Sequence, residues 1–386
     1  MKKIEYNISR LEQLLSMYRL AIPEFLALIS KGLKTPIASR EIFTKEIKIS
    51  YLKRIDKIFE KGLHYYLDPK SPETSEEASI FFRKKNFATD NLNIGAIKIV
   101  NQFEEVKLSL SAIAKLSDLK FIRKIPKYSI KDNPKEVANT LRKIFYPKFS
   151  NKKREFFKSL ISKFADQDIF VFEFIETWNK KNKANIDGFF LKPNVIVLKR
   201  YQTFRREIFT LAHELGHYLL EEEEIERLNY QSFLQKNVSK IERWCNDFAY
   251  YFLIGSYADS LDSLERASAS NDYHFDIIKT ISDNTHLSQI ALFTRLLLQN
   301  QISKLAYNNV KNEFDEKYRK SQEAKEKQKQ KMKELGLKQR GAIAKPIDSP
   351  LFISTIQNAF YGGVLNEYEV CKKLNIKPEK LEEYIQ

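Results

Sequence analysis

The stretch Arg206–Glu226, REIFTLAHELGHYLLEEEEIE, places two of the chain's five histidines four residues apart. Apolar side chains surround this pair at the three- and four-residue spacing of an amphipathic helix. On such a helix, His213 and His217 lie on one face with Cβ atoms about 5–6 Å apart, so both imidazoles can reach one ion. Because a buried histidine pair without a metal or carboxylate partner is costly, the stretch predicts a buried helix that binds a metal ion.

Glu214 follows the first histidine directly and is turned about 100° around the helix from it. Its carboxylate is therefore placed to reach a water molecule rather than the ion, and it can act as the general base once the metal lowers the pKa of that water. His213-Glu214-Leu215-Gly216-His217 is the H-E-x-x-H pattern of metallopeptidases. With so few histidines, about 0.01 accidental matches are expected. Zn²⁺ is the default ion for imidazole and carboxylate ligands, and Mn²⁺ is the alternative.

A tetrahedral catalytic site needs a third protein ligand and an open fourth position. The metzincin continuation of the pattern fails, because Leu220 and Glu223 occupy the places of its glycine and histidine. Glu221 shares the histidine face, but it lies about 12 Å along the axis from His213. The third ligand must therefore come from another part of the chain.

Glu242 begins a second amphipathic segment, SKIERWCNDFAYYFLI, and could reach the ion from a helix packed across the first. Ser239 and Glu242 also form an S-x-x-E capping box, in which the glutamate would bond back to the N-cap amide. From spacing alone both roles stay open for Glu242. The remaining candidate ligands are Cys245, His274 and His286, whereas His64 lies in a different region of the chain.

The composition of the chain gives expectations for its cellular compartment and for its binding partners. The formal charge of +16 favours nucleic acid or acidic partners, although an AT-biased genome gives the same lysine excess. Two cysteines make no disulfide framework. No apolar run approaches the roughly 20 residues of a membrane span, and the first residues lack a signal-peptide core. We expect a cytoplasmic protein without a membrane partner.

Periodicity predicts a mostly helical α+β fold with a small antiparallel sheet at about 168–200, built from DIFVFEFIE and NVIVLKR. NVIVLKR is either an edge strand that pairs with an extended substrate or an ordinary core strand. We expect five segments: a helical region at 1–70, a helical connector at 71–133, the domain of the histidine helix at 134–300, a charged helix or linker at 301–345, and a helical extension at 346–386.

FTLAHELGHYLL, followed by ERWCNDFAYYFLI, resembles the two motifs of the ImmA/IrrE family of metallo-endopeptidases. The second family motif is E-x-x-A-N-x-F-A-x-x-L-L-x-P, and the matching positions are Glu242, Asn246, Phe248, Ala249 and Leu253. The resemblance implies a zincin-like core in which His213, His217 and Glu242 bind the metal and Glu214 is catalytic. Cys245 and Gly255 depart from the motif's alanine and proline without removing a ligand.

The flanks resemble this family more weakly. Residues 1–70 are similar to a degenerate Xre-type helix-turn-helix region, but RLAIPEFLALISKGLKTPIASREIF lacks a clean second helix with base-reading side chains, which argues against direct DNA binding. The tail resembles the family's helical C-terminal extension.

The resemblance implies a narrow-specificity endopeptidase that cleaves a partner protein. Such partners are typically repressors or antitoxin-like regulators encoded nearby, in stress-response, mobile-element or phage-defence settings. Candidate second oxyanion donors are Tyr250, Tyr251 and His286. The alternative function is a DNA- or protein-binding regulator with a structural or sensory metal site.

Overall fold

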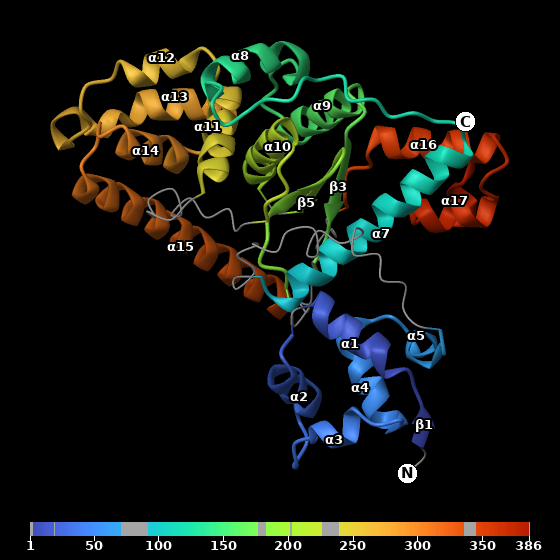
Figure 1. Ribbon diagram of the computed structural model, residues 1–386. Helices are drawn as coiled ribbons and strands as arrows, with labels where there is room; N and C mark the ends of the chain where they lie inside the picture. Colours follow the sequence, from blue (N-terminus) through green and yellow to red (C-terminus); the bar gives the residue numbers. More distant parts are fainter. Residues whose placement is uncertain are drawn as a thin grey trace. The chain divides into compact units, whose positions relative to one another are not determined.

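The computed structural model describes residues 3–18, 20–70, 92–176, 183–200, 203–225, 239–335 and 345–385 (Figure 1). The chain divides into two compact units. The first comprises Met1–Val106 with Lys181–Asn185, and the second comprises Lys107–Lys180 with Ile186–Gln386. Helix α7 (Ile94–Leu116) begins in the first unit and ends in the second.

The first unit is built from short helices, as its sequence predicts. They are α1 (Ile8–Met17), α2 (Ile22–Ser30), α3 (Ser39–Ile42), α4 (Ile49–Phe59) and α5 (Leu63–Leu67). A two-stranded antiparallel sheet of β1 (Lys3–Glu5) and β2 (Glu46–Lys48) accompanies them. Sequence reasoning missed this sheet, because three-residue strands are too short to show a readable alternation.

The second unit contains a three-stranded sheet in the order β3-β5-β4. Its strands are β3 (Phe170–Phe174), β4 (Gly188–Leu191) and β5 (Val195–Lys199). The β4 and β5 strands are antiparallel, but β3 and β5 are parallel. The sheet is therefore mixed rather than wholly antiparallel, because β4 pairs on the far side of β5 instead of folding back onto β3.

This strand order settles the role of NVIVLKR. Strand β5 lies between two neighbours, so its hydrogen-bonding groups already have partners on both sides. The prediction of an edge strand at this position is wrong, and the core-strand alternative is correct. Among the described strands of this sheet, β4 lies at one edge and β3 at the other.

Helices surround this sheet and supply most of the core. Helix α9 (Lys153–Ala165) contacts β3, and α10 (Phe204–Leu220) contacts β4 and β5 (Figure 1). Helix α11 (Lys240–Ile254) packs on α10 and on α8 (Pro134–Phe145). The main hydrophobic cluster joins these helices and the sheet. The mostly helical α+β fold is thus confirmed.

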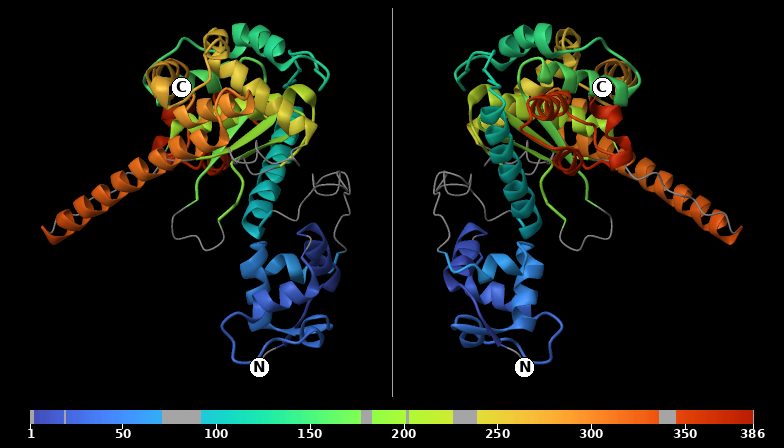
Figure 2. Two further views of the ribbon diagram at one scale, coloured as in Figure 1. Left: turned by 90° about the vertical axis from the view of Figure 1, so that its left-hand side faces the viewer. Right: turned by 90° about the vertical axis from the view of Figure 1, so that its right-hand side faces the viewer.

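The remaining helices of the second unit follow in chain order. They are α12 (Tyr257–Asp262), a 3-10 turn (Ala269–His274), α13 (Phe275–Thr285), α14 (Gln289–Leu298), α15 (Lys304–Glu334), α16 (Pro350–Tyr361), α17 (Glu367–Leu374), a 3-10 turn (Pro378–Lys380) and α18 (Glu382–Ile385). Most of α15 is exposed, as its lack of an apolar stripe predicts (Figure 2). Helix α16 packs on α9, and Phe352 makes an edge contact with Phe172 of β3, with ring centroids 5.3 Å apart. No described helix is both long enough and apolar enough to cross a bilayer.

Candidate metal centre

Helices α10 and α11 approach each other closely at Gly216. A Cβ atom on this glycine would lie 3.0 Å from the Cα of Cys245 and 3.1 Å from its Cβ and Sγ. The missing side chain therefore lets the two backbones come together. Because Cys245 follows Glu242 by three residues, this contact also brings the first turn of α11 next to the histidine face of α10.

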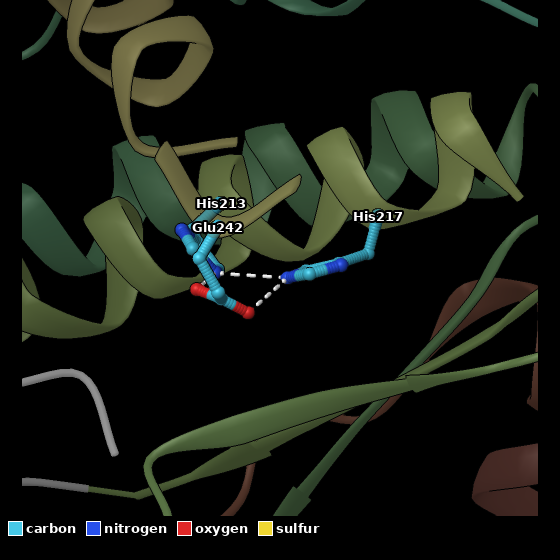
Figure 3. A group of neighbouring side chains, drawn as sticks. All are labelled: His213, His217 and Glu242. Carbon is cyan, nitrogen blue, oxygen red and sulfur yellow. Dashed lines mark hydrogen bonds and ion pairs between the residues drawn. The ribbon is translucent and has the colours of Figure 1, made fainter. Parts of the chain in front are cut away.

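Three side chains converge at this crossing (Figure 3). The Nε2 atoms of His213 and His217 are 3.1 Å apart. The carboxylate of Glu242 bridges them, with Oε2 at 3.2 Å from His213 Nε2 and Oε1 at 3.0 Å from His217 Nε2. All three residues are at most 3% exposed. In the part of the chain that the structure describes, no other group of three histidine, cysteine, aspartate or glutamate side chains gathers in this way.

The hydrogen bonding of His217 indicates what the cluster can bind. Its Nδ1 lies 3.2 Å from the carbonyl oxygen of Glu222, which accepts a hydrogen bond from the Nδ1–H group. The Nε2 of the neutral ring then presents a lone pair towards the other imidazole and the carboxylate. Lone pairs and negative charge that converge in a buried site need a cation between them. Zinc–nitrogen bonds of about 2.0–2.1 Å in a tetrahedron separate ligand atoms by about 3.3 Å, so this donor set fits a divalent metal.

The ionisation of the cluster follows from its burial and its charges. Burial opposes ionisation of Glu242, but His213 and His217 outweigh it and lower the pKa of the carboxyl group. Burial alone would lower the pKa of His217, yet the neighbouring Glu242 carboxylate raises it. The carboxylate is therefore held in the charged form that a metal ligand requires.

Glu214 lies beside the cluster without being part of it. It is 3% exposed, and its Oε2 has no hydrogen-bond partner among the described residues. Burial raises the pKa of this carboxyl group to about 8; His217 opposes that rise, and Glu242 and Asp187 add to it. A carboxyl group with a pKa near neutrality can both accept and return a proton.

The first residue of β4 approaches Glu214 closely. A Cβ atom on Gly188 would lie 3.2 Å from Glu214 Oε1 and 2.6 Å from Thr210 Cγ2. Only glycine leaves room there for the carboxylate. Sequence reasoning missed this residue, although an isolated glycine at the start of a strand pattern is a signal of close backbone approach. It also missed the Glu222 carbonyl, for which a sequence carries no side-chain signal.

Glu242 makes only half of the capping box that its sequence allowed. The Ser239 hydroxyl accepts a hydrogen bond from the Glu242 backbone N–H at 3.0 Å and donates one to Glu224 Oε2 at 2.9 Å. The Glu242 side chain turns to the two histidines instead of returning to the N-cap amide. Of the two roles that spacing left open for this side chain, the structure favours the metal ligand.

The other candidate ligands lie outside the cluster. Cys245 contacts Gly216, and burial raises the pKa of its thiol well above the usual value. His286 lies between Phe149 and Phe156, with ring centroids 4.7 and 4.3 Å away, and burial lowers its pKa to about 4. Two further histidines are elsewhere: His64 in α5 and His274 in the turn Ala269–His274.

The two tyrosines proposed as oxyanion donors differ in the hydrogen bonding of their hydroxyl groups. The Tyr251 hydroxyl accepts a hydrogen bond from Arg295 at 2.6 Å. The Tyr250 hydroxyl is buried and has no partner in the described part of the chain.

Glu221, which helix geometry excluded as a ligand, ends α10 and pairs with Lys127 at 2.9 Å.

Comparison with known families covers this same region. Residues 166–269 match the family model Peptidase_M78, described as an IrrE N-terminal-like domain. The match includes β3, β4, β5, α10 and α11, and hence every residue of the cluster and Glu214. No curated protein and no solved structure matches the chain.

Proposed function

Since residues 166–269 match the family model of an IrrE N-terminal-like peptidase domain, we propose that this protein is a zinc-dependent endopeptidase. The observation that carries the proposal is the convergence of His213, His217 and Glu242 within one buried crossing of two helices. Two imidazoles and one carboxylate are a ligand set of catalytic zinc sites. Mn²⁺ is the alternative ion.

The residues of the chain then have distinct roles. His213 and His217 present Nε2 atoms to the metal, and the Glu222 carbonyl holds the ring of His217 in the required tautomer. A divalent ion in such a site supplies Lewis-acid chemistry, polarising a peptide carbonyl and acidifying a water molecule. Glu214 accepts the proton of the attacking water at its carboxylate and passes it to the leaving amine.

We infer that the substrate is a partner protein rather than proteins in general. The family resemblance supports a repressor or antitoxin-like regulator encoded nearby, in a stress-response, mobile-element or phage-defence setting within the cytoplasm. The position of β4 at one edge of the sheet, beside Glu214, supports binding of an extended substrate segment by strand addition.

A second candidate is a DNA- or protein-binding regulator whose metal is structural or sensory. The net charge of +16 and the helical first unit favour it. Against DNA binding by that unit stands α3, which spans only four residues where a base-reading helix would need several turns.

Glu214→Gln separates the two candidates. We expect this variant to keep stoichiometric zinc, measured by mass spectrometry of the metal, and to lose at least about 100-fold in cleavage of the neighbouring regulator or of a peptide mixture. Glu242→Gln should lose both zinc and cleavage. Glu221→Gln, a matched change at the partly exposed end of the same helix, should alter neither. If Glu214→Gln leaves every activity of the protein unchanged, the regulator is the correct function.

A further inference from the structure

A small cavity lies one helical turn from the metal cluster. Its volume is about 30 Å³, and residues of α10, α11 and α14 line it. Phe209 precedes His213 by four residues, and Asn246 follows Glu242 by four, so the cavity continues the faces that carry the metal ligands. Four residues of helix rise about 6 Å. The cavity is therefore within reach of a side chain that flanks a peptide bond held at the metal.

Three buried polar atoms of the lining residues have no hydrogen-bond partner in the described part of the chain. They are Asn246 Oδ1, the Tyr250 hydroxyl and Arg295 Nε. Asn246 and Tyr250 are each only 6% exposed. Most buried polar atoms in proteins are satisfied, and each orphan costs free energy. Three unpartnered polar atoms on the residues around one small cavity are sites that a polar group entering the cavity could satisfy.

The charge of Arg295 is already balanced. Its guanidinium donates to Asp247 Oδ1 at 2.6 Å and to the Tyr251 hydroxyl at 2.6 Å, and it lies 4.6 Å from the centre of the Tyr250 ring. A carboxylate in the cavity would face Asp247, and an ammonium group would face Arg295. The cavity therefore offers no net charge to a ligand.

We propose that this cavity binds the side chain next to the cleaved bond and selects a short, uncharged polar residue: asparagine, serine or threonine. The inference rests on the proposed peptidase function. Such side chains can donate to Asn246 Oδ1 and accept from Tyr250 or Arg295. Leucine would leave all three orphan atoms unpaired, and lysine would bring a second cation beside Arg295.

Tyr250→Phe tests the proposal most sharply, because it removes the orphan hydroxyl and keeps the ring against Arg295. Removing an unpartnered buried hydroxyl leaves the melting temperature unchanged or raises it. Zinc-loaded protein is incubated with a mixture of unfolded peptides, and the residues flanking each cut are identified by mass spectrometry. We expect wild type to prefer asparagine, serine or threonine at one flanking position about tenfold over leucine, and Tyr250→Phe to lose most of this preference.

Two further variants complete the design. Asn246→Leu removes the acceptor and should shift the preference towards apolar residues. Tyr361→Phe makes the same chemical change at a position that is 65% exposed and should leave the preference intact. Identical flanking preferences in wild type and Tyr250→Phe, or a wild-type preference for lysine or large apolar residues, would overturn the proposal.

A binding measurement separates failure of the cavity from failure of the peptidase. N-acetylasparagine methylamide is titrated into zinc-loaded Glu214→Gln protein and followed by saturation-transfer NMR, with N-acetylleucine methylamide as the comparison. Selective binding of the asparagine probe that Tyr250→Phe weakens supports the cavity even if no peptide is cleaved. Equal binding of the two probes, or a cavity that holds water alone in a crystal soaked with the asparagine probe, overturns it.

Discussion

Gly216 controls the geometry of the metal cluster although it binds nothing. A Cβ atom in place of one of its hydrogens would lie 3.0–3.1 Å from the backbone and side chain of Cys245, so that the neighbour would have to move by a few tenths of an ångström. The nearest of these atoms is a Cα, which moves only if α11 moves with it. Since Glu242 lies on the same helix, the separation of the helices and the separation of the ligands are coupled.

Gly216→Ala should therefore weaken zinc binding as well as folding. We expect the added methyl group to push α11 away, to lower the free energy of unfolding by about 1–3 kcal/mol and to raise the Kd for zinc. Denaturant titration and competition with a zinc chelator measure the two effects. Cys245→Ala is the control, because it shortens the neighbouring side chain without filling the contact, and it should keep zinc. An unchanged Kd for zinc in Gly216→Ala would contradict this coupling.

The helix that carries Glu242 depends on how its first turn begins. Ser239 caps the backbone of α11 and is itself held by Glu224. Glu242 lies in that first turn, where fraying would displace the carboxylate from both histidines. The N-cap of this helix therefore affects both metal binding and the stability of the fold. The N-cap of a helix that carries no ligand affects stability alone.

Ser239→Ala and Ser288→Ala form a matched pair that tests this distinction. Ser288 caps α14 in the same way, accepting a hydrogen bond from the Ala291 backbone N–H at 3.2 Å. Each change should lower the free energy of unfolding by about 1 kcal/mol. Only Ser239→Ala should also weaken zinc binding, as measured by chelator competition. Equal zinc affinities of the two variants would show that the cluster is insensitive to the end of its helix.

At the scale of the whole second unit, a buried carboxyl pair joins segments that are distant in sequence. Glu173 of β3 and Glu207 of α10 are close enough to affect each other's pKa, and Arg200 donates to Glu207. Glu173 also accepts from the backbone N–H of Ile347, just before α16. The sheet, the metal-binding helix and the C-terminal helices thus share one polar network inside the core.

This network makes folding depend on pH. Burial, with a contribution from Glu173, raises the pKa of Glu207 to about 8, whereas the unfolded chain keeps a value near 4.5. Between these values the folded state holds a proton that the unfolded state has lost, so its contribution to stability is complete below about pH 4.5 and is lost as the pH rises through 8. One such proton changes stability by at most about 1.4 kcal/mol per pH unit.

Glu207→Gln, which mimics the protonated group, should flatten this dependence. Urea denaturation at pH 5, 7 and 8.5 should show wild type losing more stability than the variant as the pH rises. Glu155→Gln alters an exposed glutamate on α9 and should track wild type. Parallel curves for wild type and Glu207→Gln would mean that Glu207 is ionised in the folded protein.

Local patterns in the sequence predict much of this architecture. The spacing of His213 and His217 was sufficient to place two metal-binding candidates on one helix, since i and i+4 residues always share a face. Glu242 could not be chosen over its capping role from spacing, because the choice depends on how α11 crosses α10. The position of β5 was likewise undetermined, since strand order depends on long-range pairing that no short window contains. The cavity beside Asn246 could not be predicted from the sequence, because residues of α14 form part of its wall and the packing of α14 is a long-range feature.

The thiol of Cys245 sits in the seam between the two ligand-bearing helices, fully screened from water. An alkylating reagent can reach that sulfur only when the seam parts. The rate at which the native protein is alkylated at Cys245 therefore reports how often the two helices separate transiently. This measurement needs no engineered cysteine.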